Sequence, residues 1–289
     1  MSSQPGILAP PPAVGLSLSY RLVSGSDARA ALERIRAAID PRDVVVGIGE
    51  PLIRALGASV AGLRSFPALV GPGIAVPSTQ QALWVFQRGE DRGQLFDLGR
   101  QLADRLAPEL VGADSVETFL YAGGRDLTGY EDGTENPKDA AAVAAAFVKG
   151  EEHMAGSSFV AVQRWAHDLA KFRGLSGERR DATMGRRISD NEEIEDAPPS
   201  AHVKRAAQES YDPPAFMVRR SMPWVAGGAQ GLEFVAYGAD LDRYERVLRR
   251  MVGLEDGTVD GLFSFSRPLT GGYYWCPPVA NGRLDLDAL

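Results

Sequence analysis

The feature that most constrains the fold is an order of apolar patterns that the chain runs through twice. In the first round, Leu16, Leu18, Tyr20 and Leu22 alternate with polar residues, which indicates a half-buried strand. Apolar residues at helical spacing follow, and two more strands, a second helix and a last strand complete the round. The expected strands cover residues 16–22, 44–48, 82–87 and 116–121, and the expected helices cover residues 27–39, 51–56 and 92–106.

The same order recurs after an alanine-rich helix at residues 139–148. The second round has expected strands at residues 159–165, 216–220, 232–237 and 262–265, and expected helices at residues 169–175, 178–185 and 241–251. A long polar insertion, residues 186–214, separates its first helices from its second strand. Insertions of this length in a compact unit are more often functional than idle.

Each round is a β-α-β-β-α-β unit, which predicts an antiparallel sheet with helices on one face. The sequence therefore predicts an α+β protein with tandem ferredoxin-like halves, residues 13–150 and 151–289. Two such sheets either pack together or enclose something between sheet and helices. The halves share no sequence identity, so the repeat is architectural. The proline-rich residues 1–12 are expected to be extended or disordered.

Charge and composition narrow the classes of partner and site. A net charge of −7 disfavours nucleic acid and anionic membranes as partners. The single cysteine, Cys276, excludes an intrachain disulfide framework and a Cys-x-x-Cys-His haem attachment. Any haem or metal ligand therefore comes from a short list of histidines, His153, His167 and His202.

No stretch reaches the roughly 18 apolar residues that a membrane-spanning helix needs. Residues 1–12 also lack the basic start and apolar middle of a secretory signal. A cytoplasmic location is the resulting expectation.

An acidic loop, Gly129-Tyr130-Glu131-Asp132-Gly133-Thr134-Glu135-Asn136-Pro137, joins the two rounds. Its glycines allow positive φ, Asp-Gly is a turn pair, and Asn-Pro stops any helix. By itself the loop is compatible with a solvated surface turn. A functional role is the alternative, because a histidine in the polar insertion and an arginine in an apolar run follow it.

His202 lies in the polar insertion, in Pro-Pro-Ser-Ala-His-Val-Lys-Arg. A histidine in such a place is either solvated or a ligand. His153 and His167 lie in hydrophilic, surface-like contexts.

Arg219 and Arg220 follow one another in an expected strand, so they point to opposite faces. One of them faces inward unless the strand is at an edge. Arg219 is either a snorkelling arginine or a fixed cation aimed into a cavity. Asp260 precedes an apolar run and is either a turn residue or part of a site.

Four segments together resemble the dye-decolorizing peroxidases. Residues 129–137 match the G-x-x-D-G signature and its T-E-N-P continuation, and residues 200–205 resemble the segment with the axial histidine. Residues 218–223 resemble the distal arginine strand, and residues 270–274 resemble the C-terminal T-G-G-Y-Y. The segments occur in the family's order and span most of the chain. The short length is similar to the compact bacterial cytoplasmic class called B-type.

The resemblance implies catalytic roles for three residues on the distal side of a haem. Asp132 would shuttle the peroxide proton, and its low reference pKa favours acidic pH unless burial raises it. Arg219 would stabilise the charge that develops as the O–O bond breaks. Ser221 corresponds to a distal position that is asparagine in some relatives.

The resemblance also implies haem b, held non-covalently in the second half. His202 would be the proximal iron ligand, and Asp260 would accept the other ring N–H of His202. Thr134 and either Arg186 or Arg187 would meet the haem propionates.

The implied function is a haem peroxidase that reduces hydrogen peroxide through a ferryl intermediate and oxidises dyes, phenols or similar one-electron donors. The alternatives are a haem-handling or haem-sensing protein with incidental peroxidase activity and a ferredoxin-like binding module without haem. The resemblance also implies a homo-oligomer. Residues 281–286 are either a short tail that docks into an encapsulin shell or a frayed end.

Overall fold

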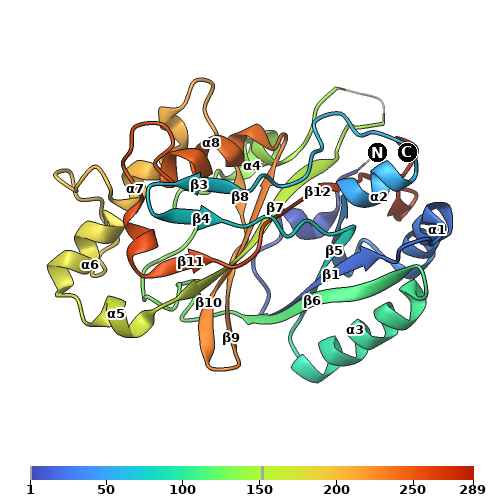
Figure 1. Cartoon of the computed structure of the whole chain (residues 1–289), viewed down its shortest axis with the longest axis horizontal. Coiled ribbons are helices and arrows are strands. Elements are labelled where there is room, and N and C mark those ends of the chain that lie inside the picture. The colour runs from blue at the N-terminus through green and yellow to red at the C-terminus, as the bar shows by residue number, and fades with distance from the viewer. Residues whose placement is uncertain (1, 151–152) are drawn as a thin grey trace.

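The computed structural model describes residues 2–150 and 153–289. Its first round of elements follows the predicted order, with a short hairpin added between the second and third main strands (Figure 1). The elements are η1 (Pro5–Ile7), β1 (Val14–Leu22), α1 (Ala28–Ala38), β2 (Val44–Gly49), α2 (Glu50–Ala55), β3 (Leu69–Gly71), β4 (Ile74–Val76), β5 (Leu83–Gly89), α3 (Arg92–Leu106) and β6 (Leu110–Phe119).

The second round follows the predicted order up to its last strand, which is formed by residues 272–276 and not by residues 262–265. Its elements are α4 (Asp139–Ala146), β7 (Ser158–His167), α5 (Leu169–Arg173), α6 (Gly177–Met184), α7 (His202–Arg205), η2 (Gln208–Ser210), β8 (Val218–Arg219), β9 (Met222–Ala226), β10 (Ala229–Gly238), α8 (Asp242–Met251), η3 (Gly261–Ser264), β11 (Ser266–Pro268), β12 (Gly272–Cys276), β13 (Val279–Ala280) and β14 (Arg283–Leu284).

Both rounds build the same antiparallel strand order. The first is β6-β1-β5-β2 and the second is β12-β7-β10-β8, so each places its fourth strand beside its first and its third beside its second. This is the predicted α+β, ferredoxin-like architecture. The predicted boundary between residues 150 and 151 adjoins residues 151–152, which lie outside the described residues.

The expectation of two separate sheets is wrong. β2 pairs with β12, with Ile48 opposite Trp275, and this pairing joins the two units into one ten-stranded sheet. The apolar edge strands of both units satisfy each other's backbone groups in this way.

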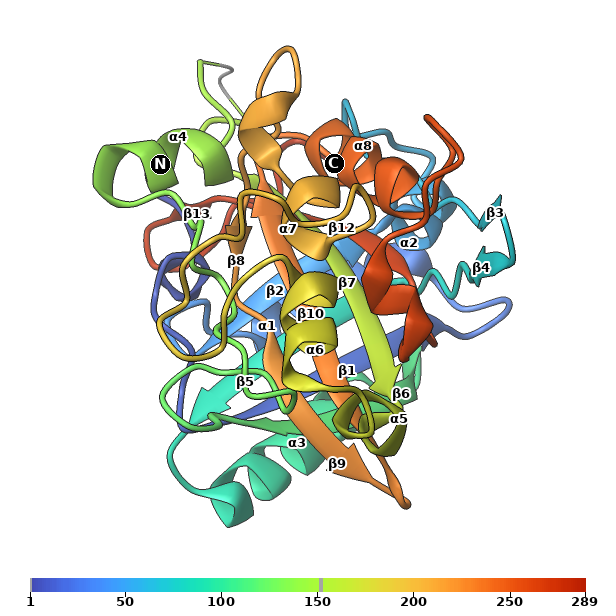
Figure 2. The ribbon, with the colours of Figure 1, turned by 90° about the vertical axis from the view of Figure 1, so that its left-hand side faces the viewer.

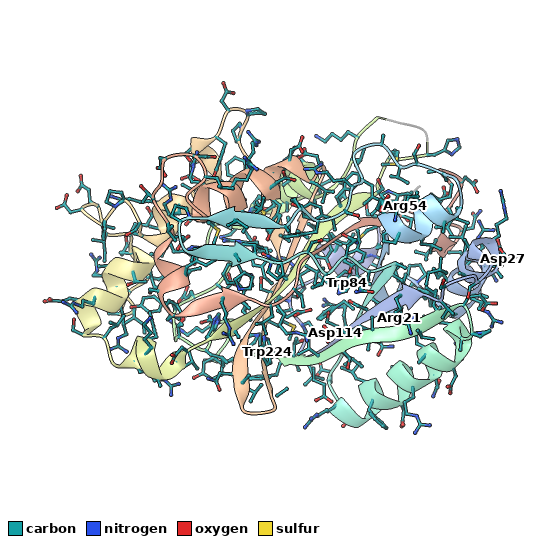
Figure 3. The ribbon with its side chains drawn as sticks, in the orientation of Figure 1. Arg21, Asp27, Arg54, Trp84, Asp114 and Trp224 are labelled. Atoms are coloured by element: carbon teal, nitrogen blue, oxygen red, sulfur yellow. The ribbon has the colours of Figure 1, made fainter. Side chains whose placement is uncertain are left out.

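The joined sheet curls back on itself. Ser17 of β1 donates a 2.7 Å hydrogen bond to Glu233 of β10, although four strands lie between them in the sheet order. Trp84 is fully buried in the core between the two units and donates to Ser17 Oγ at 2.9 Å (Figure 3). Arg54 and Asp27, in contrast, lie at the exposed periphery.

Helices cover the outer face of the sheet. In the first unit α3 begins at its N-cap Asp91, which accepts from Gln94 N at 2.8 Å, and it buries Leu95, Leu102 and Leu106. In the second unit α6, α7 and α8 lie in front of β7 and β10 (Figure 2). The polar insertion therefore passes over the sheet of the second unit, where α7 can contribute side chains to the space beneath it.

Two local expectations are wrong. Residues 262–265 form no strand, because Asp260 Oδ1 accepts from Leu262 N at 2.8 Å and caps the turn η3. Residues 2–12 are neither extended nor disordered throughout. They include η1, and Gln4 is buried, where its amide bonds both Val46 O and Val46 N. Across the described ranges, none of the helices is both long and apolar enough to cross a membrane.

A buried ion pair on β7 and β10 of the second unit lies where β1 and β6 of the first unit contact it. Glu233 is 3% exposed and its Oε2 lies 3.2 Å from Arg164 Nε. Burial raises the pKa of Glu233, and the Arg164 guanidinium opposes that rise. The negative charge of the Glu233 carboxylate is thus balanced by the positive charge of Arg164.

We expect Arg164→Ala to lower the free energy of unfolding by about 3 kcal/mol at neutral pH, because it leaves the Glu233 carboxylate buried without a cation. Without Arg164 the folded-state pKa of Glu233 rises further above its unfolded value. The destabilisation therefore grows as the pH rises through the folded-state pKa of Glu233, is largest above it, and shrinks as the pH falls and Glu233 is protonated. Urea unfolding at neutral and acidic pH measures both effects.

Arg92→Ala is the matched control, because Arg92 pairs with Glu117 on the surface with 78% of its side chain exposed. It should cost less than about 1 kcal/mol. Equal losses in the two variants, or a loss in Arg164→Ala that is independent of pH, would contradict the role of the buried pair.

Candidate active site

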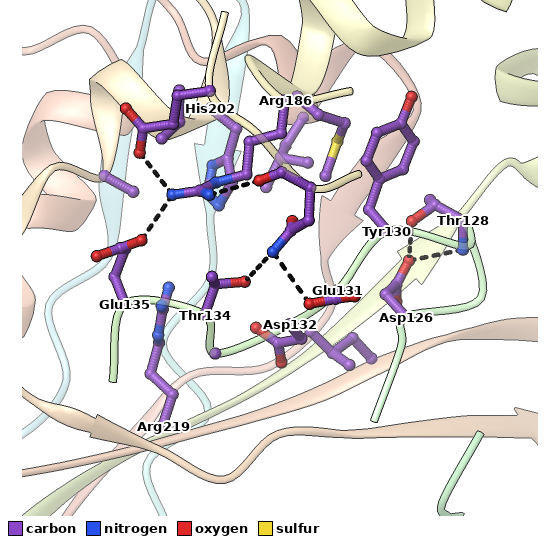
Figure 4. Close-up of a pocket in the computed structure, with 18 of the residues that line it drawn as sticks. Asp126, Thr128, Tyr130, Glu131, Asp132, Thr134, Glu135, Arg186, His202 and Arg219 are labelled. Atoms are coloured by element: carbon purple, nitrogen blue, oxygen red, sulfur yellow. Dashed lines mark hydrogen bonds and ion pairs between the residues drawn. The ribbon is translucent and has the colours of Figure 1, made fainter. Parts of the chain in front are cut away.

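A cavity lies between the sheet of the second unit and the helices over it. Two adjoining lobes share His202, Asp132 and Arg219 in their walls. The apolar part of the lining is Met217, Leu232, Phe234, Val247, Leu248, Met251, Leu262 and Phe265. In Figure 4, His202 lies on the upper side of the cavity, and Asp132 and Arg219 lie on the lower side.

His202 is held by Asp260, as the sequence predicts. His202 Nδ1 lies 2.8 Å from Asp260 Oδ2, and the Asp260 side chain is fully buried. An ionised carboxylate only accepts hydrogen bonds, so Nδ1 carries the proton and Nε2 keeps its lone pair. The His202 side chain is 24% exposed and lines the cavity.

The backbone brings these two residues together from 58 positions apart. Gly261 N donates to Ser200 O at 2.7 Å, two residues before the histidine. A Cβ at Gly261 would lie 3.0–3.2 Å from atoms of Thr183 and Ser200, so glycine permits this close approach. The histidine segment and the aspartate segment are therefore bound directly to each other.

The short helix α7 is anchored at its other end by Arg205. The guanidinium donates to both carboxylate oxygens of Asp256, at 2.8 and 2.9 Å, and to Arg250 O at 2.7 Å. The hydrogen bond from Arg205 lowers the pKa of Asp256 to about 2. His202 thus lies on a single helical turn that is fixed at both ends.

His167 is not surface-like, contrary to the expectation from its sequence context. Its side chain is only 7% exposed and lines the same cavity. Its Nδ1 lies 2.6 Å from Ser266 Oγ, and its Nε2 lies 3.2 Å from Asp126 Oδ2. Since both nitrogens have protein partners, His167 offers no lone pair to a ligand in the cavity. Neither the place of His167 in the cavity nor its partner Asp126 was predicted from the sequence.

Asp132 lies in the acidic loop, which is a surface turn with Glu131 and Glu135 exposed, but Asp132 itself lies at the cavity wall. The cavity reaches the Asp132 side chain, but protein surrounds it, and this burial raises its pKa above the usual 3.8. The Arg219 cation opposes the rise, and the Asp126 carboxylate adds to it. The carboxyl group is therefore tuned toward holding a proton at higher pH than a surface aspartate.

Arg219 and Arg220 point to opposite sides, as the strand pattern predicts. Arg219 lines both lobes of the cavity, and its buried Nε has no hydrogen-bond partner within the described part of the chain. Arg220 instead donates to Ala9 O at 2.8 Å and Leu8 O at 2.7 Å. Arg219 is thus the inward cation, and Arg220 holds down the N-terminal segment.

The remaining predicted site residues differ in the cavity that they line. Ser221 lines a neighbouring cavity, which also reaches Asp132 and Arg219. Arg186 lies at the wall of the His202 cavity, but Glu135 and Glu193 already pair with it (Figure 4). Thr134 also lines that wall.

Arg187 pairs with Asp190, and it is Arg186, not Arg187, that lines the cavity. In residues 2–150 and 153–289, no group of three or more His, Cys, Asp or Glu side chains is arranged to hold a bare metal ion.

Known proteins are similar in sequence to this chain along nearly its whole length. The family model "Dyp-type peroxidase, C-terminal" matches residues 123–281. The chain is 33% identical to a dye-decolorizing peroxidase of Brevibacterium linens over 94% of this chain and 79% of that protein. It is 31% identical to one of Mycobacterium tuberculosis over 96% of this chain and 89% of that protein.

Solved structures have the same backbone arrangement. An arginine-to-leucine variant of DypB from Rhodococcus jostii RHA1, in complex with heme, superposes with a TM-score of 0.84 at 29% identity over 94% of both chains. An asparagine-to-alanine variant of DypB, in complex with manganese, has a TM-score of 0.86 at 29% identity over 96% of both chains. The family model covers more than half of the sequence and the relatives match along nearly all of it, so this chain belongs to the Dyp-type peroxidase family.

Proposed function

We propose that this chain is a haem peroxidase that reduces hydrogen peroxide to water and oxidises a small-molecule reductant, such as a phenol or a dye. One observation carries the proposal. An imidazole whose Nδ1 is held by a buried carboxylate lines a cavity that also holds a carboxyl group and an arginine, whose Nε has no hydrogen-bond partner among the described residues. Membership of the Dyp-type peroxidase family supports the same assignment.

The residues that line the cavity fit a haem. The apolar side chains from β10, α8 and η3 suit the faces of a flat macrocycle, and His202 Nε2 is a free donor for its iron. Arg219 Nε lacks a partner in the described residues, as expected of a group that meets a bound ligand. When bound, haem would supply the electron transfer between peroxide and the reductant.

Asp260 would tune the ligand from behind. Its carboxylate accepts a hydrogen bond from His202 Nδ1–H. This bond fixes the tautomer of the imidazole and makes Nε2 a stronger electron donor. The carboxylate is held in place, because Leu262 N donates to Asp260 Oδ1 and Asp260 N donates to Met251 O. The pair acts as one unit, and we assign Asp260 a positioning role.

Asp132 would move the proton. Reduction of hydrogen peroxide to two water molecules takes two electrons and two protons, and the O–O bond breaks only as the leaving oxygen is protonated. The Asp132 carboxylate can accept the first peroxide proton and return it to the leaving oxygen, directly or through one water. Its place on the cavity wall beside Arg219 supports this role.

Arg219 would stabilise the negative charge that develops on the departing oxygen. A guanidinium stays protonated at all relevant pH values, and a buried one without a competing carboxylate partner keeps its charge available. Ser221, Thr134 and Arg186 have weaker support. Ser221 faces the neighbouring cavity, and Arg186 would have to exchange a carboxylate partner for a propionate.

The proposed role of Asp132 predicts the pH dependence of the peroxide reaction. The carboxylate must be ionised to accept a proton, so the rate falls as the pH drops through the pKa of Asp132. Burial raises that pKa, so the acid limb should lie above 3.8, where an unshifted aspartate would place it. Arg219 lowers the pKa, so Arg219→Ala should move the limb to still higher pH. Stopped-flow rates measured across the pH range give both positions.

Asp132→Asn is the control for this profile, since an amide does not titrate. Its slower reaction should lack the acid limb. A wild-type limb that persists in Asp132→Asn, or one that moves to lower pH in Arg219→Ala, would assign the titration to another group.

Turnover tests the proposed activity directly. The haem-loaded protein should oxidise a phenol or an anthraquinone dye with hydrogen peroxide far faster than an equal concentration of free haemin. Turnover no faster than that of free haemin, together with rapid haem transfer to apomyoglobin, would favour a haem-handling protein instead. The cytoplasmic location, the homo-oligomeric state and encapsulation stay predictions. The interpretation of residues 281–286 as a frayed end is wrong, because β14 pairs with β13 and Leu284 and Leu286 are buried.

A further inference from the structure

The backbone of Arg219 is held by a side-chain amide from the acidic loop. β8 is only two residues long and is the last strand in the sheet order. Arg219 N donates to Asn136 Oδ1 at 2.8 Å, and Asn136 Nδ2 donates to Arg219 O at 3.0 Å. The Asn136 amide thus takes the place of the next strand and satisfies both backbone groups on the open edge of Arg219.

The same asparagine belongs to the turn that presents Asp132. Asn136 N donates to Gly133 O at 3.0 Å, so residues 133–136 form a closed turn directly after Asp132. Gly133 has a φ of +72°, and a Cβ there would lie 2.7 Å from Asn136 Nδ2. One turn conformation therefore positions both the Asp132 carboxyl group and the Asn136 amide.

The two bonds join groups that are 83 residues apart in the sequence. The pair Asp132 and Arg219 comes from two elements, a loop and an edge strand, and among residues 2–150 and 153–289 no hydrogen bond joins the two side chains. Asn136 lines the neighbouring cavity with both of them. Its amide is the contact that sets how far apart the two functional side chains lie.

We propose that Asn136 is a positioning residue that fixes Arg219 relative to Asp132, and that the peroxide reaction depends on it through that geometry. The inference rests on the proposed function for its kinetic consequence. Its structural part, the amide bridge to the backbone of Arg219, does not depend on haem.

Hydrogen exchange of the apoprotein tests the structural part. In Asn136→Ala the Arg219 amide should exchange at least tenfold faster, because it loses its acceptor. The Arg220 amide donates to Val235 O at 2.8 Å and serves as the reference within the same strand. Equal protection of the Arg219 amide in wild type and variant would overturn the inference.

Kinetics test the functional part. We expect Asn136→Ala to lower kcat/KM for peroxide by about tenfold to a hundredfold, since misplacement of a catalytic group by about 1 Å has effects of this size. The KM for the reductant and the haem content should not change. A loss of haem with no change in the rate per bound haem would show a merely structural role and contradict the proposal.

Gln80→Ala is the matched control. The Gln80 amide makes the same pair of bonds to one strand residue, accepting from Tyr273 N at 2.8 Å and donating to Tyr273 O at 2.7 Å. Gln80 does not line the cavity of His202. Its variant should lose stability but keep kcat/KM for peroxide within about twofold of wild type, as expected for a clamp away from the reacting groups.

A double variant shows whether Asn136 acts through Arg219. In an Arg219→Ala background, Asn136→Ala should cost little more, because there is no guanidinium left to position. Full additivity of the two losses would overturn the proposal. If the wild-type protein shows no peroxide reaction at all, the proposed function fails, while the exchange result still decides whether the bridge exists.

Discussion

His202→Ala abolishes tight haem binding and lowers the rate of the peroxide reaction by more than about a hundredfold. Loss of a residue that only supports a metal ligand costs about tenfold to a hundredfold, so loss of the ligand itself should exceed that range. The substitution leaves a space the size of an imidazole next to Asp260, which is buried and keeps its carboxylate. Added imidazole should therefore bind in that space and restore part of the Soret absorption.

The other two histidines are the controls. His153 is exposed, so His153→Ala should leave the Soret band and the peroxide rate unchanged. His167 lines the cavity, but Ser266 and Asp126 bond both of its nitrogens, so His167→Ala should retain the axial ligand. A Soret band that survives in His202→Ala and disappears in His167→Ala would reverse the assignment.

Arg219→Ala and Asp132→Asn should each slow the peroxide reaction by about 10²–10³-fold while haem stays bound. A preorganised group that stabilises developing charge contributes about 3 kcal/mol to the transition state. Arg219 Nε is buried and has no hydrogen-bond partner within the described residues. For Asp132, the loss is that of a proton carrier next to the reacting oxygens.

Single-mixing stopped flow, with the Soret absorption as the signal, measures these rates against peroxide concentration. Haem content per chain, determined for each variant beforehand, separates slow chemistry from lost cofactor. Second-order rates within twofold of wild type in both variants would remove these two residues from the mechanism. A loss in one variant alone would show which group dominates.

Much of the fold follows from local patterns. The alternation of Leu16, Leu18 and Tyr20 predicts β1, and helix α3 begins and ends where its apolar spacing does. The joining of β2 to β12 does not follow, because edge pairing between distant strands depends on shape and leaves no local mark. Residues 262–265 are apolar enough for a strand, but the Asp260 cap turns them into η3.

The site residues that could be predicted from the sequence are those whose residue type is unusual for its surroundings. His202 in a polar insertion and Arg219 in an apolar run are such cases, and both lie in the cavity. His167 was missed, although extending the alternation of Gln163 and Trp165 by one step would have placed it on the same face of β7. The bridge from Asn136 could not be foreseen, because it joins a loop to a strand edge through one amide.

The most direct test of the central claim is a titration of the apoprotein with haemin, followed by Soret absorption. The account predicts a sharp endpoint at one haem per chain, with the spectrum of a histidine-ligated iron. A titration without an endpoint, or one that is the same in His202→Ala, would contradict the claim that this imidazole holds the haem.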